Sequence, residues 1–334
     1  MRINSRTWKY WCANFSGVLY SVIVIFGITL LNLFYTCPGL YGSDACYPVF
    51  WHAFVILSEI LVNLYLFHYY NVKNQISYWT VKSSVIPKKE EERVLIENEE
   101  EESNEDVKRN GRLVITKEGV YRKEVFVPEE VPNNKHKYCM ECKQTMPRRS
   151  HHCPLCEICV LRKDHHCFLT GGCVGLANQR FFIVFLIWAC IGSLYGSYFT
   201  LKYIHYKLVN QWFPYEWLRF VAPIALVRWF FGYDTLFNMM FSVLACASVA
   251  TTLASAGFFG AQMFYTLQGY TMHDYHVGRL RDRLESDGNN YSERLALVFG
   301  KRWWLNFLIP QIWLPNQMTP EIAKNIFVSV SKDL

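Results

Sequence analysis

Residues 139–182 read CMECKQTMPRRSHHCPLCEICVLRKDHHCFLTGGCVGLANQRFF, and they hold seven of the 12 cysteines of the chain. Three Cys-x2-Cys pairs, two of them overlapping, stand among four histidines: Cys139/Cys142, Cys153/Cys156, Cys156/Cys159, His151, His152, His165 and His166. Close pairs of this kind are the usual way in which a chain supplies thiolates to zinc. The stretch offers enough ligands for two four-coordinate sites, and one cysteine is left over.

Four long apolar runs flank this stretch, at residues 15–36, 49–70, 181–201 and 236–266. Each run exceeds the roughly 18–20 residues with which a helix crosses about 30 Å of hydrocarbon. A buried soluble helix can be equally apolar, but four such runs in one chain favour membrane spans. We therefore predict an α-helical integral membrane protein with four transmembrane helices and the cysteine-rich segment between helices 2 and 3.

The basic residues of the loops predict the orientation. Arg2, Arg6 and Lys9 precede the first run, and lysines follow the second, whereas residues 37–48 contain no Lys or Arg. Because loops rich in Lys and Arg stay on the cytosolic side, both termini and the cysteine-rich segment should be cytosolic. Residues 217–231 are apolar but contain two arginines and a proline, so we expect a lumenal or interfacial helix there and not a fifth span.

A cytosolic location favours metal over disulfides for these cysteines, because thiols stay reduced there. Cys37 and Cys46 fall in the opposite loop, where a disulfide is permitted. A zinc finger that reads nucleic acid is a further alternative, but the Cys-x2-Cys-x9-His-Cys spacing differs from that of such fingers. We expect no nucleic-acid partner.

The composition is that of a mixed protein. The chain has 334 residues, 51% of them hydrophobic, which excludes collagen-like, disordered and small disulfide-rich classes. Residues 88–106 carry a net charge of −7, so the remainder carries +13 within the total of +6. We predict five segments: 1–70 with helices 1 and 2, a cytosolic linker with an acidic stretch at 71–135, a zinc domain at 136–180, helices 3 and 4 at 181–267, and a cytosolic tail with an amphipathic segment at 268–334.

The full pattern is Cys-x2-Cys-x9-His-Cys-x2-Cys-x2-Cys-x4-Asp-His-His-Cys-x5-Cys-x4-Asn-x3-Phe. It resembles the cysteine-rich domain of the DHHC family of protein S-acyltransferases, or palmitoyltransferases. The resemblance covers about 44 residues, and the flanking pairs of spans are similar to the family architecture. Among subgroups, the short chain is most similar to the animal member numbered twenty-four.

The resemblance implies two structural zinc ions. One would be held by Cys139, Cys142, His152 and Cys159, and the other by Cys153, Cys156, His166 and Cys173. The remaining Cys167 corresponds to the nucleophile of the family, with His165 as its base and Asp164 orienting that histidine. A thiol of ordinary pKa is a weak nucleophile until such a base shifts it toward the thiolate.

The reaction that the resemblance implies has two steps. Cys167 takes a palmitoyl or other long-chain acyl group from acyl-CoA and passes it to a cysteine of a membrane-associated protein substrate. The chain-length gate of the family falls near the small Gly192, and Arg148, Arg149 and His151 are candidates for the CoA phosphates. Endoplasmic reticulum or Golgi membrane is the location that the family implies.

The chain departs from the family pattern at several places. Residues 168–172 read FLTGG where the family has Pro-Trp-Val-Asn-Asn, and Met146 replaces a basic residue. The Asp-Pro-Gly that follows the second span in the family is missing, and its Thr-Thr-x-Glu motif is reduced to Thr-Met-His-Asp at residues 271–274. The alternative function is therefore a catalytically weak or inactive zinc-stabilised membrane scaffold or adaptor with the same fold.

Overall fold

The computed structural model describes residues 5–75, 138–147, 149–209, 214–276, 286–312, 316–319, 322–323 and 326. The predicted linker at 71–135 lies almost wholly outside these residues. The chain divides into two compact units. The membrane unit contains Met1–Tyr65, Cys167–Gly171 and Phe181–Gln262, and the Cys/His unit contains Leu66–His166, Gly172–Arg180 and Met263–Leu334.

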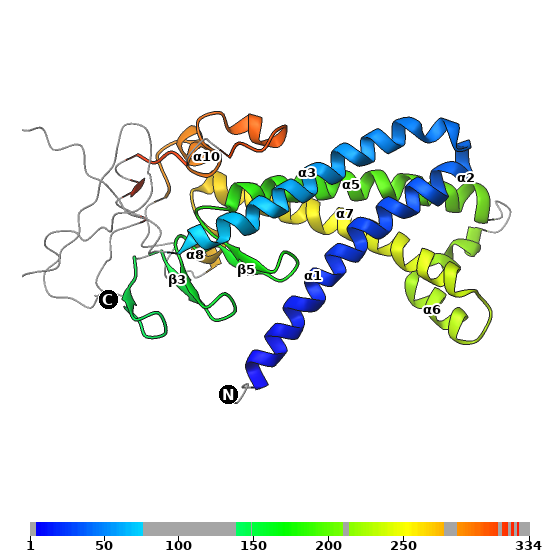
Figure 1. Cartoon of the computed structure of the whole chain (residues 1–334), viewed down its shortest axis with the longest axis horizontal. Coiled ribbons are helices and arrows are strands. Elements are labelled where there is room, and N and C mark those ends of the chain that lie inside the picture. Colours follow the sequence, from blue (N-terminus) through cyan, green and yellow to red (C-terminus); the bar gives the residue numbers. More distant parts are fainter. Residues whose placement is uncertain are drawn as a thin grey trace, which may run out of the picture. The chain divides into compact units, whose positions relative to one another are not determined.

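Four helical stretches within the described residues are long and apolar enough to span a membrane: Trp8–Tyr41, Asp44–Asn74, Gln179–Leu208 and Leu236–Gln268. The prediction of four transmembrane helices is confirmed (Figure 1). The protein is thus an α-helical, multi-pass membrane protein, and its cysteine-rich segment lies between the second and third spans.

The first two spans form a helical hairpin in the membrane unit. The first span consists of α1 (Ser5–Leu31), the π-turn η1 (Asn32–Thr36) and α2 (Cys37–Tyr41), and it ends at Gly42, whose φ of 84° stops the helix. The short η2 (Asp44–Cys46) then leads into α3 (Tyr47–Asn71), which is followed by η3 (Val72–Asn74). A disulfide joins Cys37 to Cys46 across this connection.

The last two spans are α5 (Gln179–Tyr203), extended by η5 (Ile204–Leu208), and α7 (Leu236–Gln268). Small residues let them approach each other and α1. A Cβ atom on Gly196 of α5 would lie 2.3 Å from Ile28 of α1, so no larger residue fits there without a shift. Across α5 and α7, Ser197 hydrogen-bonds Ser248 at 2.7 Å and Thr252 donates to Ser193 at 3.0 Å. Such small and hydroxylic contacts are typical of helix pairs in membranes.

The connection between α5 and α7 contains the 3-10 helix η6 (Pro214–Phe220) and α6 (Ala222–Phe230). At 1.5 Å per residue, α6 is only about 14 Å long, which is too short to cross the hydrocarbon. The segment predicted at 217–231 is therefore not a fifth span.

The described residues of the Cys/His unit form three two-stranded sheets. They pair β1 (Tyr138–Cys139) with β2 (Gln144–Thr145), β3 (His151–Cys153) with β4 (Ile158–Val160), and β5 (His165–Cys167) with β6 (Gly172–Val174). The tail adds α8 (Met272–His276), α10 (Tyr291–Phe299) and η7 (Trp303–Phe307). Strands this short cannot stabilise a fold alone, so this unit depends on cross-links of another kind.

Candidate active site and metal groups

The Cys-x2-Cys pairs lie in tight turns. Residues 143 and 157, each directly after the second cysteine of a pair, have positive φ values of 49° and 54°. This left-handed step turns the chain back so that both thiols of a pair face the same point. In the β3–β4 sheet, His152 stands opposite Cys159. Pairing of these strands thus brings together ligands that are seven residues apart in the sequence.

Two groups of four ligand atoms result. Cys139, Cys142, His152 and Cys159 form the first, and Cys153, Cys156, His166 and Cys173 the second, each with its ligand atoms within 4.8 Å of one another. In the first group the Nδ1 atom of His152 lies 3.3 Å from Cys142 Sγ and 3.9 Å from Cys159 Sγ. In the second, His166 Nδ1 lies 3.4–3.6 Å from all three sulfur atoms.

These distances fit tetrahedral zinc. Bond lengths of about 2.3 Å to sulfur and 2.0–2.1 Å to nitrogen, at the tetrahedral angle, separate the two ligands by about 3.5 Å. The ligand atoms of the second group also share protons. Hydrogen bonds from Cys156 and Cys173 hold the pKa of Cys153 far below its usual range. Burial lowers the pKa of His166, but hydrogen bonds with Cys153 and Cys156 raise it to about 9. Each group could therefore hold a metal ion, which would take the place of shared protons.

The side chains of strand β5 (His165–Cys167) point to two opposite faces. Successive side chains of a strand point to opposite faces, so His165 and Cys167 share one face while His166 points to the other, toward the second metal group. His165 Nδ1 lies 2.7 Å from Asp164 Oδ2, and the side chain of Asp164 is only 1% exposed. A buried carboxylate in this position keeps the proton on Nδ1 and makes Nε2 the basic nitrogen of the ring.

The second oxygen of Asp164 is also engaged. The backbone N–H of Met272 donates to Asp164 Oδ1 at 2.6 Å, and the Asp164 backbone N–H donates to the carbonyl of Val174 at 2.9 Å. The carboxylate is thus fixed from the tail as well as from the β5–β6 segment.

Cys167 is half-buried and begins a tight loop in the membrane unit. Its carbonyl accepts a hydrogen bond from the N–H of Gly171, whose φ is 69°. Helix α1 supports this loop, because the Ser21 hydroxyl donates to the Leu169 carbonyl at 3.0 Å. A Cβ atom on Gly17 would lie 2.6 Å from the Phe168 carbonyl oxygen. The sequence FLTGG, which departs from the family pattern, therefore packs directly on the first span.

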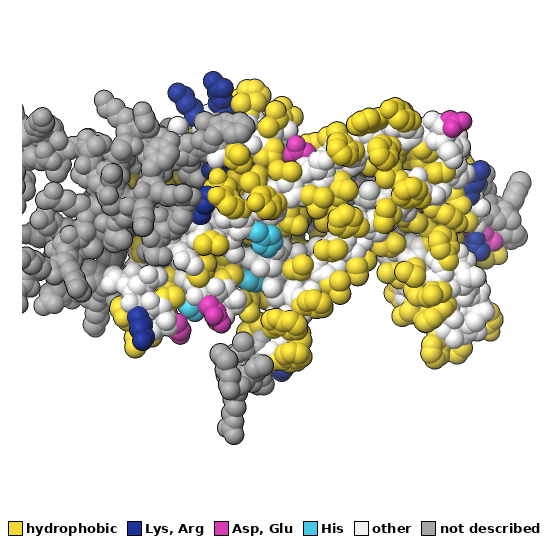
Figure 2. Space-filling model, viewed as in Figure 1, with side chains coloured by type: hydrophobic (Ala, Val, Ile, Leu, Met, Phe, Trp, Pro, Cys, Tyr) yellow, Lys and Arg dark blue, Asp and Glu magenta, His cyan; other side chains and the backbone are white. Residues whose placement is uncertain are grey.

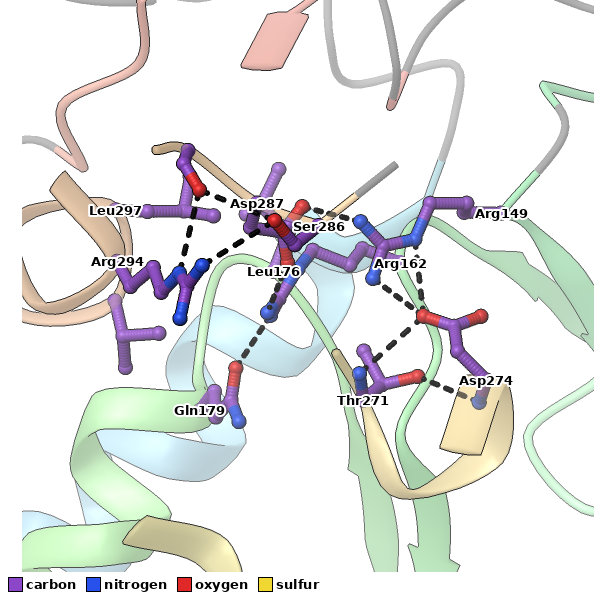
Figure 3. Close-up of polar contacts among 12 residues, drawn as sticks. Arg149, Arg162, Leu176, Gln179, Thr271, Asp274, Ser286, Asp287, Arg294 and Leu297 are labelled. Carbon is purple, nitrogen blue, oxygen red and sulfur yellow. Dashed lines mark hydrogen bonds and ion pairs between the residues drawn. The ribbon is translucent and has the colours of Figure 1, made fainter. Parts of the chain in front are cut away.

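A buried charge network joins the tail to the metal-binding hairpins (Figure 3). Arg149 pairs with Asp274 and Asp287, and Arg162 pairs with Asp287 at 2.7 Å and donates to Gln179 at 2.5 Å. Burial disfavours the charge on Arg149, but Asp287 and Asp274 raise its pKa above the usual range. Burial likewise opposes ionisation of Asp274, yet Arg149 holds the pKa of this carboxyl below its ordinary value. Two cations and two anions thus neutralise each other.

Residues 271–274 form a capping box at the start of α8. The Asp274 N–H donates to the Thr271 hydroxyl at 3.1 Å, and the Thr271 N–H donates to the Asp274 carboxylate at 3.3 Å. This reciprocal pair begins the helix that presents the Met272 N–H to Asp164. The reduced motif therefore still supplies a hydroxyl and a carboxylate.

The residues predicted for the CoA phosphates lie in different environments. Arg149 is 1% exposed and bound to two carboxylates, so its prediction is corrected: it holds the tail and has no free face for a phosphate. His151 is half-buried, with its ring 3.9 Å from that of His273. Arg148 lies outside the described residues.

Gly192 lines a cavity in the membrane unit. The cavity holds about 610 Å³ of space between atoms, part of it open to the outside, and α1, α3, α5 and α7 all contribute to its wall. Most of the lining is aliphatic, including Val24, Ile28, Ile56 and Ile60. A Cβ atom on Gly192 would lie 2.8 Å from Ile56 and 3.4 Å from Ile60. The absence of a side chain at Gly192 therefore keeps this part of the cavity open.

Residues 132–278 match the family model described as DHHC palmitoyltransferase. This part of the chain is similar to the DHHC family.

Among similar proteins is the palmitoyltransferase ZDHHC22 of Rattus norvegicus, 32% identical over 184 residues, which cover 55% of this chain and 62% of the relative. The Homo sapiens ZDHHC22 is 32% identical over 52% of this chain and 59% of its own length. The Danio rerio palmitoyltransferase ZDHHC20-B is 27% identical over 76% of this chain and 74% of the relative. This chain thus spans less than two thirds of the ZDHHC22 relatives. Similarity to member twenty-four stays a prediction, because these relatives carry other numbers.

The sequence did not single out three parts of this site: Arg162, Asp287 and the backbone N–H of Met272. Arg162 stands just before the Asp-His-His-Cys tetrad and has a φ of 46°, but nothing in its sequence context shows that it is buried. Asp287 lies 125 residues further along, in a tail without clear periodicity. Only the folded tail brings these residues together.

We predict that Cys156→Ser reduces the zinc bound by the purified protein from two ions to one, because a group with three strong ligands holds zinc poorly. Metal content is measured by mass spectrometry, and thermal unfolding should shift to lower temperature in parallel. Cys12→Ser is the matched control, since Cys12 lies outside both groups. Equal zinc content in the wild type and Cys156→Ser contradicts the assignment.

We predict that Asp287→Asn lowers the free energy of unfolding by about 3–5 kcal/mol, because it leaves two buried arginines short of a counter-charge. The control is Asp234→Asn, which removes the partly exposed pair with Arg228 and should cost at most about 1 kcal/mol. Denaturation in detergent micelles measures both. A loss as small as that of the control argues against the network.

Proposed function

We propose that this protein is a protein S-acyltransferase that moves a palmitoyl or similar long-chain acyl group from acyl-CoA, through Cys167, to a cysteine of a protein substrate. The observation that carries the proposal is the buried hydrogen bond between Asp164 and His165, on the strand that also carries Cys167. The match of residues 132–278 to the DHHC palmitoyltransferase family model and the names of similar proteins support it.

In the first step His165 accepts the thiol proton of Cys167, and the thiolate attacks the thioester carbonyl of acyl-CoA. The bond between the acyl carbon and the CoA sulfur breaks, and CoA leaves with the proton held by His165. In the second step His165 deprotonates the substrate thiol, and its sulfur attacks the acyl carbon. The bond between the acyl carbon and the Cys167 sulfur breaks, and Cys167 regains the proton from His165. Asp164 stabilises the imidazolium that forms in both steps.

The two Cys/His groups are proposed to hold structural zinc ions. With four protein ligands each, they leave no open position for a substrate, which is the mark of a structural site. When bound, zinc would fix the hairpins that carry Asp164 and His165.

The cavity of the membrane unit is proposed as the site of the acyl chain. Its aliphatic lining matches an alkyl group, and each buried CH₂ contributes about 0.8 kcal/mol. Arg148 and His151 remain candidates for the CoA phosphates.

The proposed orientation places both termini and the active site in the cytosol, as the loop charges predict. Endoplasmic reticulum or Golgi membranes are the proposed location. The substrates would be membrane-associated proteins with cytosolic cysteines, because Cys167 belongs to a loop that packs on a span.

The zinc-stabilised scaffold is the second candidate, and FLTGG after Cys167 is the feature that favours it. Both functions predict bound zinc, whereas only the transferase predicts an acyl-enzyme.

We predict that the purified wild-type protein, incubated with an alkynyl palmitoyl-CoA analogue, acquires a label that neutral hydroxylamine removes. Cys167→Ser should lose this label completely, because the hydroxyl is a far weaker nucleophile. Cys12→Ser serves as control and should label like the wild type. If the wild type labels no better than Cys167→Ser while both bind zinc, the scaffold is the correct function.

We predict that Gly192→Leu shifts the preferred donor from palmitoyl-CoA to myristoyl-CoA. The new side chain meets Ile56 and fills the cavity, and overpacking by about 1–3 kcal/mol lowers the palmitoyl rate about 5- to 160-fold. Gly257→Leu is the matched control, because a Cβ atom there meets nothing within 4 Å. Competition between the two donors measures the ratio of palmitoyl to myristoyl transfer. If Gly192→Leu leaves this ratio unchanged, the acyl chain does not lie beside Gly192.

A further inference from the structure

Helix α6 exposes an unusual amount of apolar surface. Its exposed large side chains, with those that directly follow it, are Ile224, Leu226, Val227, Trp229, Phe230 and Phe231. Of the nine residues of α6, only Ala225 is buried. Figure 2 shows hydrophobic side chains covering this part of the membrane unit. In water such a surface would be costly, so it needs a partner.

The depth of α6 follows from the register of α5 and α7. The hydrogen bonds of Ser193 with Thr252 and of Ser197 with Ser248 show that the two helices run antiparallel and give their alignment. By this register Cys246 of α7 lies level with Phe199 of α5. Phe199 is three residues before Lys202, which is about 5 Å along the helix.

Lys202 marks the edge of the hydrocarbon on the side of the α5–α7 connection. Its ammonium group donates to the hydroxyls of Tyr41 at 2.5 Å and Tyr198 at 3.1 Å. Lysine and tyrosine side chains gather at membrane interfaces, where an apolar body and a polar tip are both accommodated. Cys246 therefore lies about 5 Å inside this edge.

Cys246 holds the start of α6. Its sulfur accepts a hydrogen bond from the Ala222 N–H at 3.3 Å and donates to the Phe220 carbonyl at 3.4 Å. Phe220 packs in a buried cluster with Ile204, Phe241 and Ala245. The first turn of α6 is thus fixed at a depth where the surroundings are acyl chains.

The other end of α6 carries its charge. Arg228 pairs with Asp234 at 3.5 Å, and Asp234 also accepts from the Asn238 side chain at 2.6 Å at the start of α7. A paired arginine with a long apolar stem can reach the headgroup region from a helix that starts deeper.

We propose that α6 is a re-entrant segment whose exposed side chains insert among the lipid acyl chains of the leaflet on this side of the membrane. At 100° per residue, the five exposed apolar residues of α6 cover about 220° of its circumference. A protein partner covers one face of a helix, whereas lipid surrounds it. The lipid-facing surface of the spans continues onto α6, since Leu236, Phe237 and Met240 of α7 are exposed as well.

The test places the photoreactive residue p-benzoylphenylalanine at Val227 or Phe230 of the full chain in phosphatidylcholine nanodiscs. Ser43, exposed in the connection between the first two spans, is the control position on the same side. We expect lipid adducts by mass spectrometry at Val227 and Phe230 and none at Ser43. Adducts with a second copy of the chain, or no lipid adduct above the Ser43 level, overturn the proposal.

A second measurement uses Trp229→Phe, which keeps an aromatic ring and so preserves the packing. In nanodiscs with brominated acyl chains, bromine should quench the emission of Trp229 in the wild type. The fraction of tryptophan emission that is quenched should therefore be larger in the wild type than in Trp229→Phe. Identical quenching in the two proteins shows that Trp229 does not meet lipid and overturns the proposal.

Discussion

The Cys/His unit depends on cross-links because its strands are too short to hold together by pairing alone. Each strand has two or three residues, and the paired sheets have only two strands. Two groups of four Cys and His side chains lie where the hairpins meet, and a metal ion bound in each would tie the hairpins together. The position of Asp164 and His165 follows from this, because the strand that sends His166 to a metal group must turn His165 to the opposite face.

The buried charges form a second set of cross-links, which connects the tail to the hairpins. Arg149 and Arg162 share Asp287, and Arg149 also holds Asp274, whose helix begins with the N–H that binds Asp164. A change in the tail can therefore reach the Asp164 carboxylate through this network. The capping box explains how a chain with a reduced family motif keeps this connection.

Much of the fold could be predicted from the sequence, because hydrocarbon thickness and ligand spacing act over short stretches of chain. The four spans could be predicted from the length of the apolar runs alone. The two ligand sets followed from a resemblance, and the hairpins bring those residues together. The prediction that Arg149 contacts the CoA phosphates is wrong, because the tail buries this side chain. The sequence around Arg149 does not show that the tail covers it.

The sequence by itself determined the class of protein and its four spans, since both depend on uninterrupted hydrophobic length. The division into two ligand groups and the candidate nucleophile followed from the resemblance of residues 139–182 to the DHHC family. Only the tertiary structure decided which carboxylates neutralise Arg149 and Arg162, and at what depth α6 begins. Both depend on residues that are far apart in the chain: Asp287 is 125 residues from Arg162, and Cys246 is 24 from Ala222. No local pattern encodes such a pairing, because burial and charge compensation are settled only when the segments pack.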